Sequence, residues 1–220
     1  MTHSQGFLAA MILYCIRHGE SAYNAEGRIQ GQIDIPLSEL GRRQGAALAT
    51  VLAGLPIQAV YCSPLLRARE TAAPLAEALR LKIACDDRLK EVHAGVFQGL
   101  RWPEVMAKYP GEAQRWKAYE PDFIIPGGES RQQLLERGTA FFHALRAEGH
   151  RQVVIVSHGG LLSAALKGLL QIPAALQPFR FYNAAISKFD WNGQLKILAI
   201  NQTDHLRAAG LDQETRTGDL

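Results

Sequence analysis

The sequence predicts an α/β protein with three layers, α/β/α, in which helices cover both faces of a mostly parallel central sheet. Two observations indicate this fold. Apolar, strand-like runs alternate with amphipathic helical segments, and the runs Met11–Ile16 and Gln152–Ser157 are as rich in apolar and β-branched residues as strands buried on both faces. Because such sheets bind ligands at the carboxyl ends of their strands, polar residues that follow a strand are the first site candidates.

The first half of the chain alternates strand and helix twice. After the first strand, Leu37–Gly41 opens a helix with Ser38 as its N-cap, and Gly54 and Pro56 close it. Ala59–Cys62 is a short apolar strand. Ser63–Pro64 then predicts the cap and first position of a second helix.

The later elements continue the pattern and complete the sheet. Lys82–Cys85 predicts an edge strand, and the run ending at Ser157 leads into a helix over Leu161–Leu170. Ala185–Trp191 and Leu195–Ile200 predict a hairpin at the other edge, since the intervening Asn-Gly favours a type I′ turn.

The chain reads as a single domain, 1–220, with one insertion. Residues 92–128 are rich in Trp, Tyr and Pro with short amphipathic pieces, which predicts a partly helical insertion over the active site. The polar ends, 1–6 and 207–220, are expected to be flexible.

Composition excludes several classes of partner. The formal charge of +3 is small and the Lys and Arg residues are dispersed, so nucleic acid is not expected. The apolar stretch Phe7–Ile16 is too short to cross a bilayer. Three cysteines, two of them in apolar predicted strands, are typical of reduced thiols in a cytoplasmic protein. Neither the cysteines nor the histidines have zinc-site spacing.

Arg17 and His18 place a cation and an imidazole at the end of the first predicted strand. Neutral imidazole is a nucleophile toward phosphorus near pH 7, and a guanidinium can hold two phosphate oxygens. His158 follows a later strand and begins a helix whose dipole favours an anion. With Arg67 as a second cation and Glu91 as the candidate acid, the chain has the groups that cleavage of a phosphomonoester requires.

Several motifs, ordered along the chain from Met11 to Leu206, resemble the histidine phosphatase superfamily, also called the phosphoglycerate mutase-like superfamily. One such motif would be weak, whereas the ordered set is specific. The motifs are Arg17-His18-Gly19-Glu20-Ser21 with Asn24, Gly27-Arg28-Ile29-Gln30-Gly31, Asp34-Ile35-Pro36-Leu37-Ser38, Ser63-Pro64 through Arg67 to Thr71, Leu89-Lys90-Glu91, Ser157-His158-Gly159-Gly160 and Asn201 to Leu206.

The resemblance implies a phosphohistidine mechanism that uses neither a metal nor a cofactor. His18 would attack phosphorus, and water or a second acceptor would then take the phosphoryl group. Arginines beside His18 would keep it neutral, whereas His158 would be charged against the bound dianion. The implied catalytic residues are His18, Glu91, His158, Arg17 and Arg67, and the implied phosphate- or substrate-binding residues are Arg17, Asn24, Gln30, Gly31, Arg67, His158 and Gly159.

The expected activity is hydrolysis of a small phosphorylated metabolite. The insertion lacks the basic-aromatic segments with which mutases of the superfamily hold phosphoglycerate, and the chain resembles the bacterial branch of α-ribazole and broad-specificity phosphatases. Two alternatives stay open: a 2,3-bisphosphoglycerate-dependent phosphoglycerate mutase and a non-catalytic phosphate-recognising regulatory module. One departure concerns Glu91, because Gln98 stands where the family pattern often has an acidic residue.

The sequence leaves the physiological substrate open. Aromatic and apolar residues of the insertion could line a substrate pocket or pack the insertion onto the sheet, and His93 could face either a pocket or solvent. An edge strand near Lys82 could pair two copies as a homodimer. The pocket candidates are Trp102, Met106, Tyr109, Trp116, Tyr119, Phe123, Ile124 and Ile125.

Overall fold

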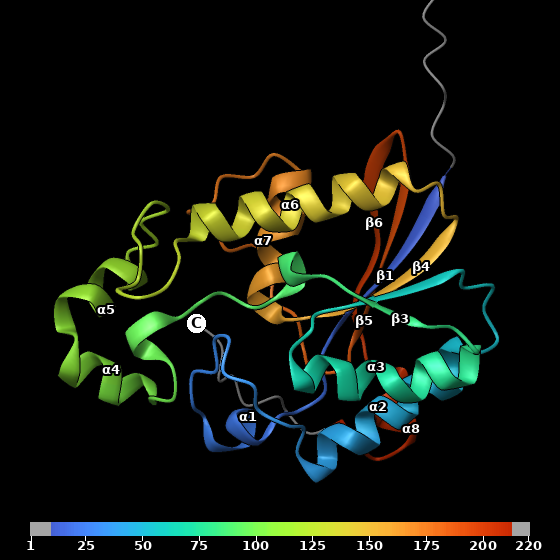
Figure 1. The fold of residues 1–220 in the computed structure, drawn as a ribbon, viewed down its shortest axis with the longest axis horizontal. Helices are drawn as coiled ribbons and strands as arrows, with labels where there is room; N and C mark the ends of the chain where they lie inside the picture. The colour runs from blue at the N-terminus through green and yellow to red at the C-terminus, as the bar shows by residue number, and fades with distance from the viewer. Residues whose placement is uncertain (1–9, 213–220) are drawn as a thin grey trace, which may run out of the picture.

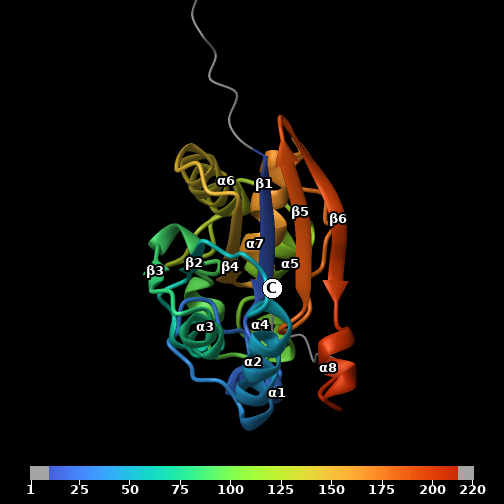
Figure 2. The ribbon, with the colours of Figure 1, turned by 90° about the vertical axis from the view of Figure 1, so that its right-hand side faces the viewer.

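The computed structural model describes residues 10–212, which form a six-stranded sheet with helices on both faces (Figure 1). The strand order is β3-β2-β4-β1-β5-β6 (Figure 2). The strands are β1 (Met11–Arg17), β2 (Ala59–Cys62), β3 (Ile83–Cys85), β4 (Gln152–Ser157), β5 (Ile186–Asn192) and β6 (Gln194–Gln202). The predicted three-layer α/β fold is confirmed.

The sheet is parallel from β3 through β1, and the C-terminal hairpin adds two antiparallel pairings, β1 with β5 and β5 with β6. The hairpin lies at the predicted edge, but its turn is not of type I′. Asn192 pairs with Gln194 inside the ladder, so Gly193, at φ 74°, alone adopts the left-handed conformation.

Each face of the sheet has its own hydrophobic core. Leu13 and Cys15 face the core beneath α6 and α7, whereas Tyr14 and Ile16, one residue out of phase, face the core beneath α2 and α3. The continuous apolar run of β1 is thus explained by burial on both sides. The helices concerned are α2 (Glu39–Leu52), α3 (Leu66–Leu79), α6 (Arg131–Ala147) and α7 (Gly159–Leu169).

The helix starts show where capping chemistry was predictable. Ser38 caps α2 as expected, because its Oγ accepts the Gly41 N–H at 3.0 Å. The start of α3 was predicted wrongly. Leu65 is extended and is the N-cap, so the helix begins at Leu66 and Ser63 lies two residues before the cap.

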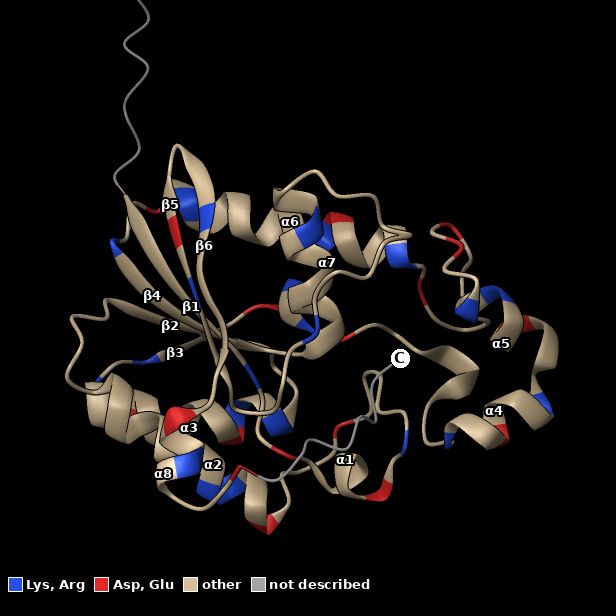
Figure 3. Cartoon of the chain, turned by 180° about the vertical axis from the view of Figure 1, so that it is seen from behind, with Lys and Arg blue, Asp and Glu red and all other residues tan. Residues whose placement is uncertain are grey.

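The insertion carries the short helices α4 (Trp102–Lys108) and α5 (Pro110–Lys117), which extend beyond the end of the sheet (Figure 3). The chain then returns through Phe123 and Ile125, both buried in the core beneath α6, whereas Ile124 is 52% exposed. The remaining short helices are α1 (Ala22–Glu26), the 3₁₀ turns η1 (Asp87–Leu89) and η2 (Gly95–Phe97), and α8 (Asp204–Ala208).

The C-terminal stretch from Arg207 to Asp212, expected to be flexible, packs on the body of the protein. Leu211 is only 3% exposed within the core beneath α2 and α3, and its carbonyl accepts the Gln44 side-chain N–H at 3.3 Å. The expectations for 1–6 and 213–220 lie outside the described residues. Among residues 10–212, no helix combines the length and the apolarity that a bilayer crossing needs.

Candidate active site

The strand order brings three polar strand ends together. β4 lies between β2 and β1, so Ser63, His158 and His18 follow adjacent parallel strands. Backbone hydrogen bonds fix this alignment: His18 N–H donates to Ser157 O at 2.9 Å and Ser63 N–H donates to Val156 O at 3.0 Å. The His18 and His158 rings consequently lie 5.1 Å apart between centroids.

His18 is arranged as a neutral nucleophile. Its Nδ1 lies 2.7 Å from Gly19 O and donates to that carbonyl, so the lone pair is on Nε2. Complete burial lowers the pKa of His18 well below its usual range, and the charges of Arg67 and Arg17 lower it further. These influences favour the neutral form of His18 that is expected from the sequence.

His158 shares a hydrogen bond between its Nε2 and Ser63 Oγ at 2.8 Å. Burial lowers the pKa of His158 well below the usual range, and the charge of Arg67 lowers it further. Both influences favour the neutral form of the free ring, and the charged His158 expected against a bound dianion stays a prediction. A phosphate dianion placed between them would favour the protonated form of either ring.

Both predicted arginines are buried beside the imidazoles. The Arg67 guanidinium donates to Gly31 O at 2.7 Å and Ile33 O at 2.9 Å, and the Arg17 guanidinium donates to Phe181 O at 2.9 Å. The backbone of Gly31 thus orients Arg67, and a direct contact between Gly31 and phosphate or substrate stays a prediction. The structure brings Arg17, Arg67, His18 and His158 together as expected.

Asn24 and Gln30 are buried, and the Ser21 hydroxyl lies within hydrogen-bond distance of the side-chain oxygen of each. Ser21 Oγ donates to Gln30 Oε1 at 2.6 Å and Asn183 Nδ2 donates to Asn24 Oδ1 at 3.3 Å. Within the described chain, neither the Nδ2 of Asn24 nor the Nε2 of Gln30 donates a hydrogen bond. Buried donors without an acceptor are costly, and phosphate oxygens would supply acceptors.

Glu91 lies at the N-terminus of α7, where the sequence predicts an anion. Its carboxylate accepts the N–H groups of Gly160 and Leu161, each at 3.0 Å, and of Val92 at 2.8 Å. The side chain is 4% exposed. A Cβ on residue 160 would lie 2.5 Å from Glu91 Oε1, so glycine there permits the approach.

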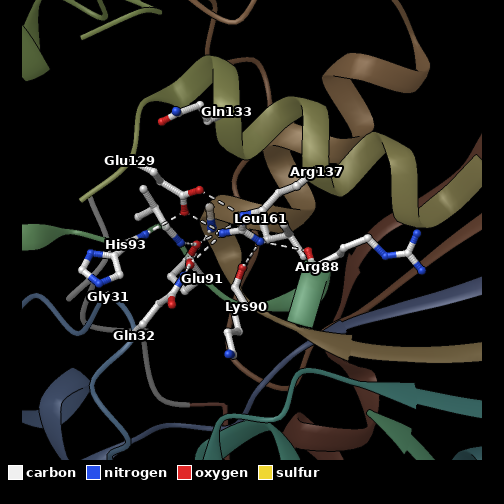
Figure 4. A network of polar contacts seen from close by, with 12 residues as sticks. Gly31, Gln32, Arg88, Lys90, Glu91, His93, Glu129, Gln133, Arg137 and Leu161 are labelled. Carbon is white, nitrogen blue, oxygen red and sulfur yellow. Dashed lines mark hydrogen bonds and ion pairs between the residues drawn. The ribbon is translucent and has the colours of Figure 1, made fainter. Parts of the chain in front are cut away.

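A clamp of Arg137 and Glu129 holds the backbone around Glu91 (Figure 4). The Arg137 guanidinium donates to Lys90 O at 2.6 Å and Glu91 O at 2.8 Å, and it also forms an ion pair with Glu129 at 2.6 Å. Glu129 in turn accepts the His93 N–H at 2.7 Å. The clamp fixes where the Glu91 carboxylate lies.

A cavity of about 320 Å³ opens beside this cluster. Arg17, Gly159 and Gly160 line its inner end, and Trp116 and Tyr119 line it from the insertion. The other pocket candidates, Trp102, Met106, Tyr109 and the segment 123–125, do not line it, nor does His93. The other residues that line the cavity are Val92, Arg131, Leu134, Ser163, Ala164, Lys167, Gln177, Phe179, Arg180 and Phe181.

Sequence reasoning missed two polar residues that support the site. Ser63 directly follows β2 and bonds His158, so the rule about strand ends could have found it. Asn183 donates to His18 O at 2.8 Å from an irregular loop, and nothing in its local sequence marks it. Among residues 10–212, no three His, Cys, Asp or Glu side chains lie close enough together to hold a metal ion.

Residues 13–203 match the family model of the histidine phosphatase superfamily, branch 1. The chain belongs to this superfamily. Glucosyl-3-phosphoglycerate phosphatase of Mycobacterium tuberculosis is 38% identical over 180 residues, which cover 78% of this chain and 80% of that protein. Metal-independent phosphoserine phosphatase of Arabidopsis thaliana is 36% identical over 211 residues, covering 93% and 87%.

Solved structures agree with this membership. The α-ribazole phosphatase of Shigella flexneri superposes with a TM-score of 0.81 at 28% identity, over 87% of this chain and 96% of that one. Histidine phosphatases of this kind hydrolyse phosphomonoesters without a metal and through a phosphohistidine, and this chain is an enzyme of that group.

Proposed function

We propose that His18 is the nucleophile of a hydrolase acting on small phosphomonoesters, with Arg17, Arg67 and His158 holding the phosphoryl group and Glu91 as the proton donor. The observation that carries the proposal is the state of His18. Its Nε2 lone pair is fixed by the Nδ1 bond to Gly19, and two arginines and a second imidazole surround it.

The reaction would proceed in two displacements. His18 Nε2 forms a bond to phosphorus while the bond from phosphorus to the ester oxygen breaks, and the leaving alkoxide takes a proton from Glu91, which must enter this step in its protonated form. Water then attacks the phosphohistidine and gives a proton to Glu91, the P–N bond breaks, and inorganic phosphate leaves. Arg17 and Arg67 stabilise the charge on the nonbridging oxygens throughout.

Asn24, Gln30, Gly31 and Gly159 complete the proposed binding set. The two amides each have a buried N–H group without an acceptor, and Gly31 orients Arg67. A mycobacterial relative, a glucosyl-3-phosphoglycerate phosphatase 34% identical to this chain, has been solved with inorganic phosphate (TM-score 0.76, covering 89% of this chain and 99% of that one). The compounds in the relatives' names are phosphomonoesters, which supports a small-molecule substrate of that class.

The proposal is tested by trapping the phosphoenzyme. We expect acid-quenched wild-type protein to carry ³²P from a labelled phosphomonoester on His18, in buffer containing EDTA, and to hydrolyse p-nitrophenyl phosphate. His18→Asn should lose both the label and the turnover, whereas His143→Asn, an exposed histidine on α6, should keep both. Normal turnover by folded His18→Asn would contradict the assignment.

An assay of the reaction products separates a hydrolase from a mutase. A hydrolase releases inorganic phosphate from 3-phosphoglycerate or phosphoserine in proportion to substrate consumed. A mutase returns the phosphoryl group, so a coupled assay would detect 2-phosphoglycerate with little phosphate. A regulatory module without turnover would show neither product.

We further propose a cytoplasmic enzyme that engages neither nucleic acid nor membrane, supported by the free thiols of Cys15, Cys62 and Cys85 and the absence of a basic run. A homodimer formed across the β3 edge is the proposed assembly, because this edge of the sheet is unpaired. Subcellular fractionation tests the first proposal. Light scattering of wild type and Ile83→Pro tests the second, with a monomeric wild type contradicting it.

A further inference from the structure

The cavity beside the active site has more positive charge than one phosphate requires. Four of the residues that line the cavity are cationic, namely Arg17, Arg131, Lys167 and Arg180. No Asp or Glu is among its lining residues. Arg17 belongs to the inner, phosphate end. The other three come from α6, α7 and the loop before β5, so they form a second cationic cluster (Figure 3 shows the Lys and Arg positions of α6 and α7).

Arg131 is the most informative member of this cluster. It is only 8% exposed, and its guanidinium carbon lies 3.4 Å from the Trp116 ring centroid and 4.7 Å from that of Tyr119. Within residues 10–212 the guanidinium makes no hydrogen bond or ion pair, and its buried Nη1 has no acceptor. Stacking on the two rings therefore fixes the plane of the Arg131 guanidinium. Residues 10–212 provide no hydrogen-bond acceptor for its N–H groups.

A buried cation without a counter-charge is expensive to keep for stability alone. Burial lowers the pKa of Arg131 only to about 10, so it remains charged at neutral pH. An anionic ligand in the cavity would supply both the missing charge and the missing acceptors.

Lys167 places a second charge against the same space. Its Nζ donates to Ala174 O at 2.9 Å and Leu176 O at 3.0 Å, which holds the loop after α7 and leaves one of three N–H donors for another partner. Arg180, farther along this loop, is exposed at the cavity rim.

We propose that this cationic cluster binds a carboxylate on the alcohol part of the substrate, so that the preferred substrates are phosphorylated hydroxy or amino acids. This rests on the proposed function, which places the phosphate beside Arg17 and His18. The planar fork of Arg131 matches a carboxylate in bidentate fashion. Trp116 and Phe179 offer apolar walls for the carbon skeleton, and 320 Å³ suits a small molecule.

The test compares substrates that differ by the carboxylate. We would measure kcat/KM for phosphoserine against phosphoethanolamine, and for 3-phosphoglycerate against glycerol 3-phosphate. We expect the wild type to favour the carboxylate member of each pair by tenfold or more. In Arg131→Met, which keeps apolar stacking area on Trp116, the preference should fall by roughly 10- to 100-fold, the cost of losing a charged hydrogen bond.

Two further variants distinguish a specific effect of Arg131→Met from a folding defect. Arg43→Met, the same substitution at an exposed position of α2, should leave the preference unchanged. Arg180→Met, at the exposed rim, should lower the preference by a smaller factor. Thermal unfolding confirms that each protein is folded.

Three outcomes would overturn the inference. The first is a wild-type preference for the carboxylate substrate near one, and the second is an unchanged preference in both Arg131→Met and Arg180→Met. The third is a preference for fructose 1,6-bisphosphate over fructose 6-phosphate that exceeds the preference for the carboxylate substrates, which would assign the cluster to a second phosphate. In each case the enzyme would still hydrolyse p-nitrophenyl phosphate. Loss of that activity in the wild type would instead contradict the proposed function, so the two failures are distinguishable.

Discussion

Replacing Glu91 with Gln separates the structural and chemical duties of one carboxylate. Oε1 accepts from Val92 and Leu161, and Oε2 accepts from Gly160. Glutamine keeps one oxygen but presents an NH₂ group to one of these donors. At least one buried N–H loses its acceptor, and the N-terminus of α7 loses a negative charge.

The expected cost in stability follows from these contacts. An unsatisfied buried donor costs about 1–3 kcal/mol, and a charge at a helix N-terminus contributes about 0.3–1 kcal/mol. The free energy of unfolding should fall by about 2 kcal/mol, which for a chain of this size lowers the melting temperature by roughly 4–8 °C. Differential scanning calorimetry measures this shift.

The catalytic effect depends on the leaving group. If Glu91 protonates the departing alcohol, Glu91→Gln should slow alkyl phosphates such as glycerol 3-phosphate by about 10²- to 10⁴-fold. p-Nitrophenyl phosphate, whose leaving group needs little protonation, should slow far less. Single-turnover rates at a temperature well below the transition keep the two effects apart.

Glu70→Gln is the matched control, because Glu70 also accepts a backbone N–H, from Leu37 at 2.7 Å, but lies in α3 and not at the start of α7. It should lose stability without changing the alkyl-to-aryl rate ratio. Equal slowing of both substrates by Glu91→Gln would refute the assignment and place the acid elsewhere.

Three further outcomes are expected. Arg67→Met should lower kcat/KM by about 10²- to 10³-fold, as for removal of a donor to a transition-state oxyanion, in steady-state assays with p-nitrophenyl phosphate; a change under fivefold would contradict its role. Because the folded pKa values of His18 and His158 lie below the unfolded value near 6.5, unfolded protein binds protons that native protein cannot. Stability should therefore fall as pH drops below 6.5, by up to about 1.4 kcal/mol per pH unit for each ring, and urea unfolding of His158→Asn should show a shallower fall. Arg137→Lys keeps the charge but cannot reproduce the forked contacts, so it should slow alkyl phosphates more than aryl phosphates; an unchanged ratio would leave the clamp without a catalytic effect.

The sequence predicts the centre of the site because parallel strands end at one edge of a sheet. His18 and His158 directly follow buried strands, so topology alone brings them close. Arg67 was placed by its motif, although the start of its helix was misjudged. The Ser63-Pro64 pair has the signature of a helix cap, but the helix begins later, at Leu66, and the Ser63 hydroxyl bonds both the Leu65 N–H and His158.

Contacts that depend on tertiary packing were not predictable. Glu91 is named from its motif, but the local sequence does not predict that amides of α7 and Arg137, a helix residue that reads as a solvated cation, fix its place. Arg131 and Lys167 likewise look like ordinary charges at a helix start and a helix end. Only the packing of α6 against α7 and the insertion brings them to one cavity.

The position of β4 between β1 and β2 has a consequence for biogenesis. During synthesis, the segments bearing His18 and Arg67 leave the ribosome long before the strand with which β1 and β2 both pair. A fragment ending ahead of Gln152 would possess the nucleophile yet lack the frame that aims it. Turnover therefore reports that the last parallel strand has docked, and phosphatase assays offer a sensitive measure of complete refolding.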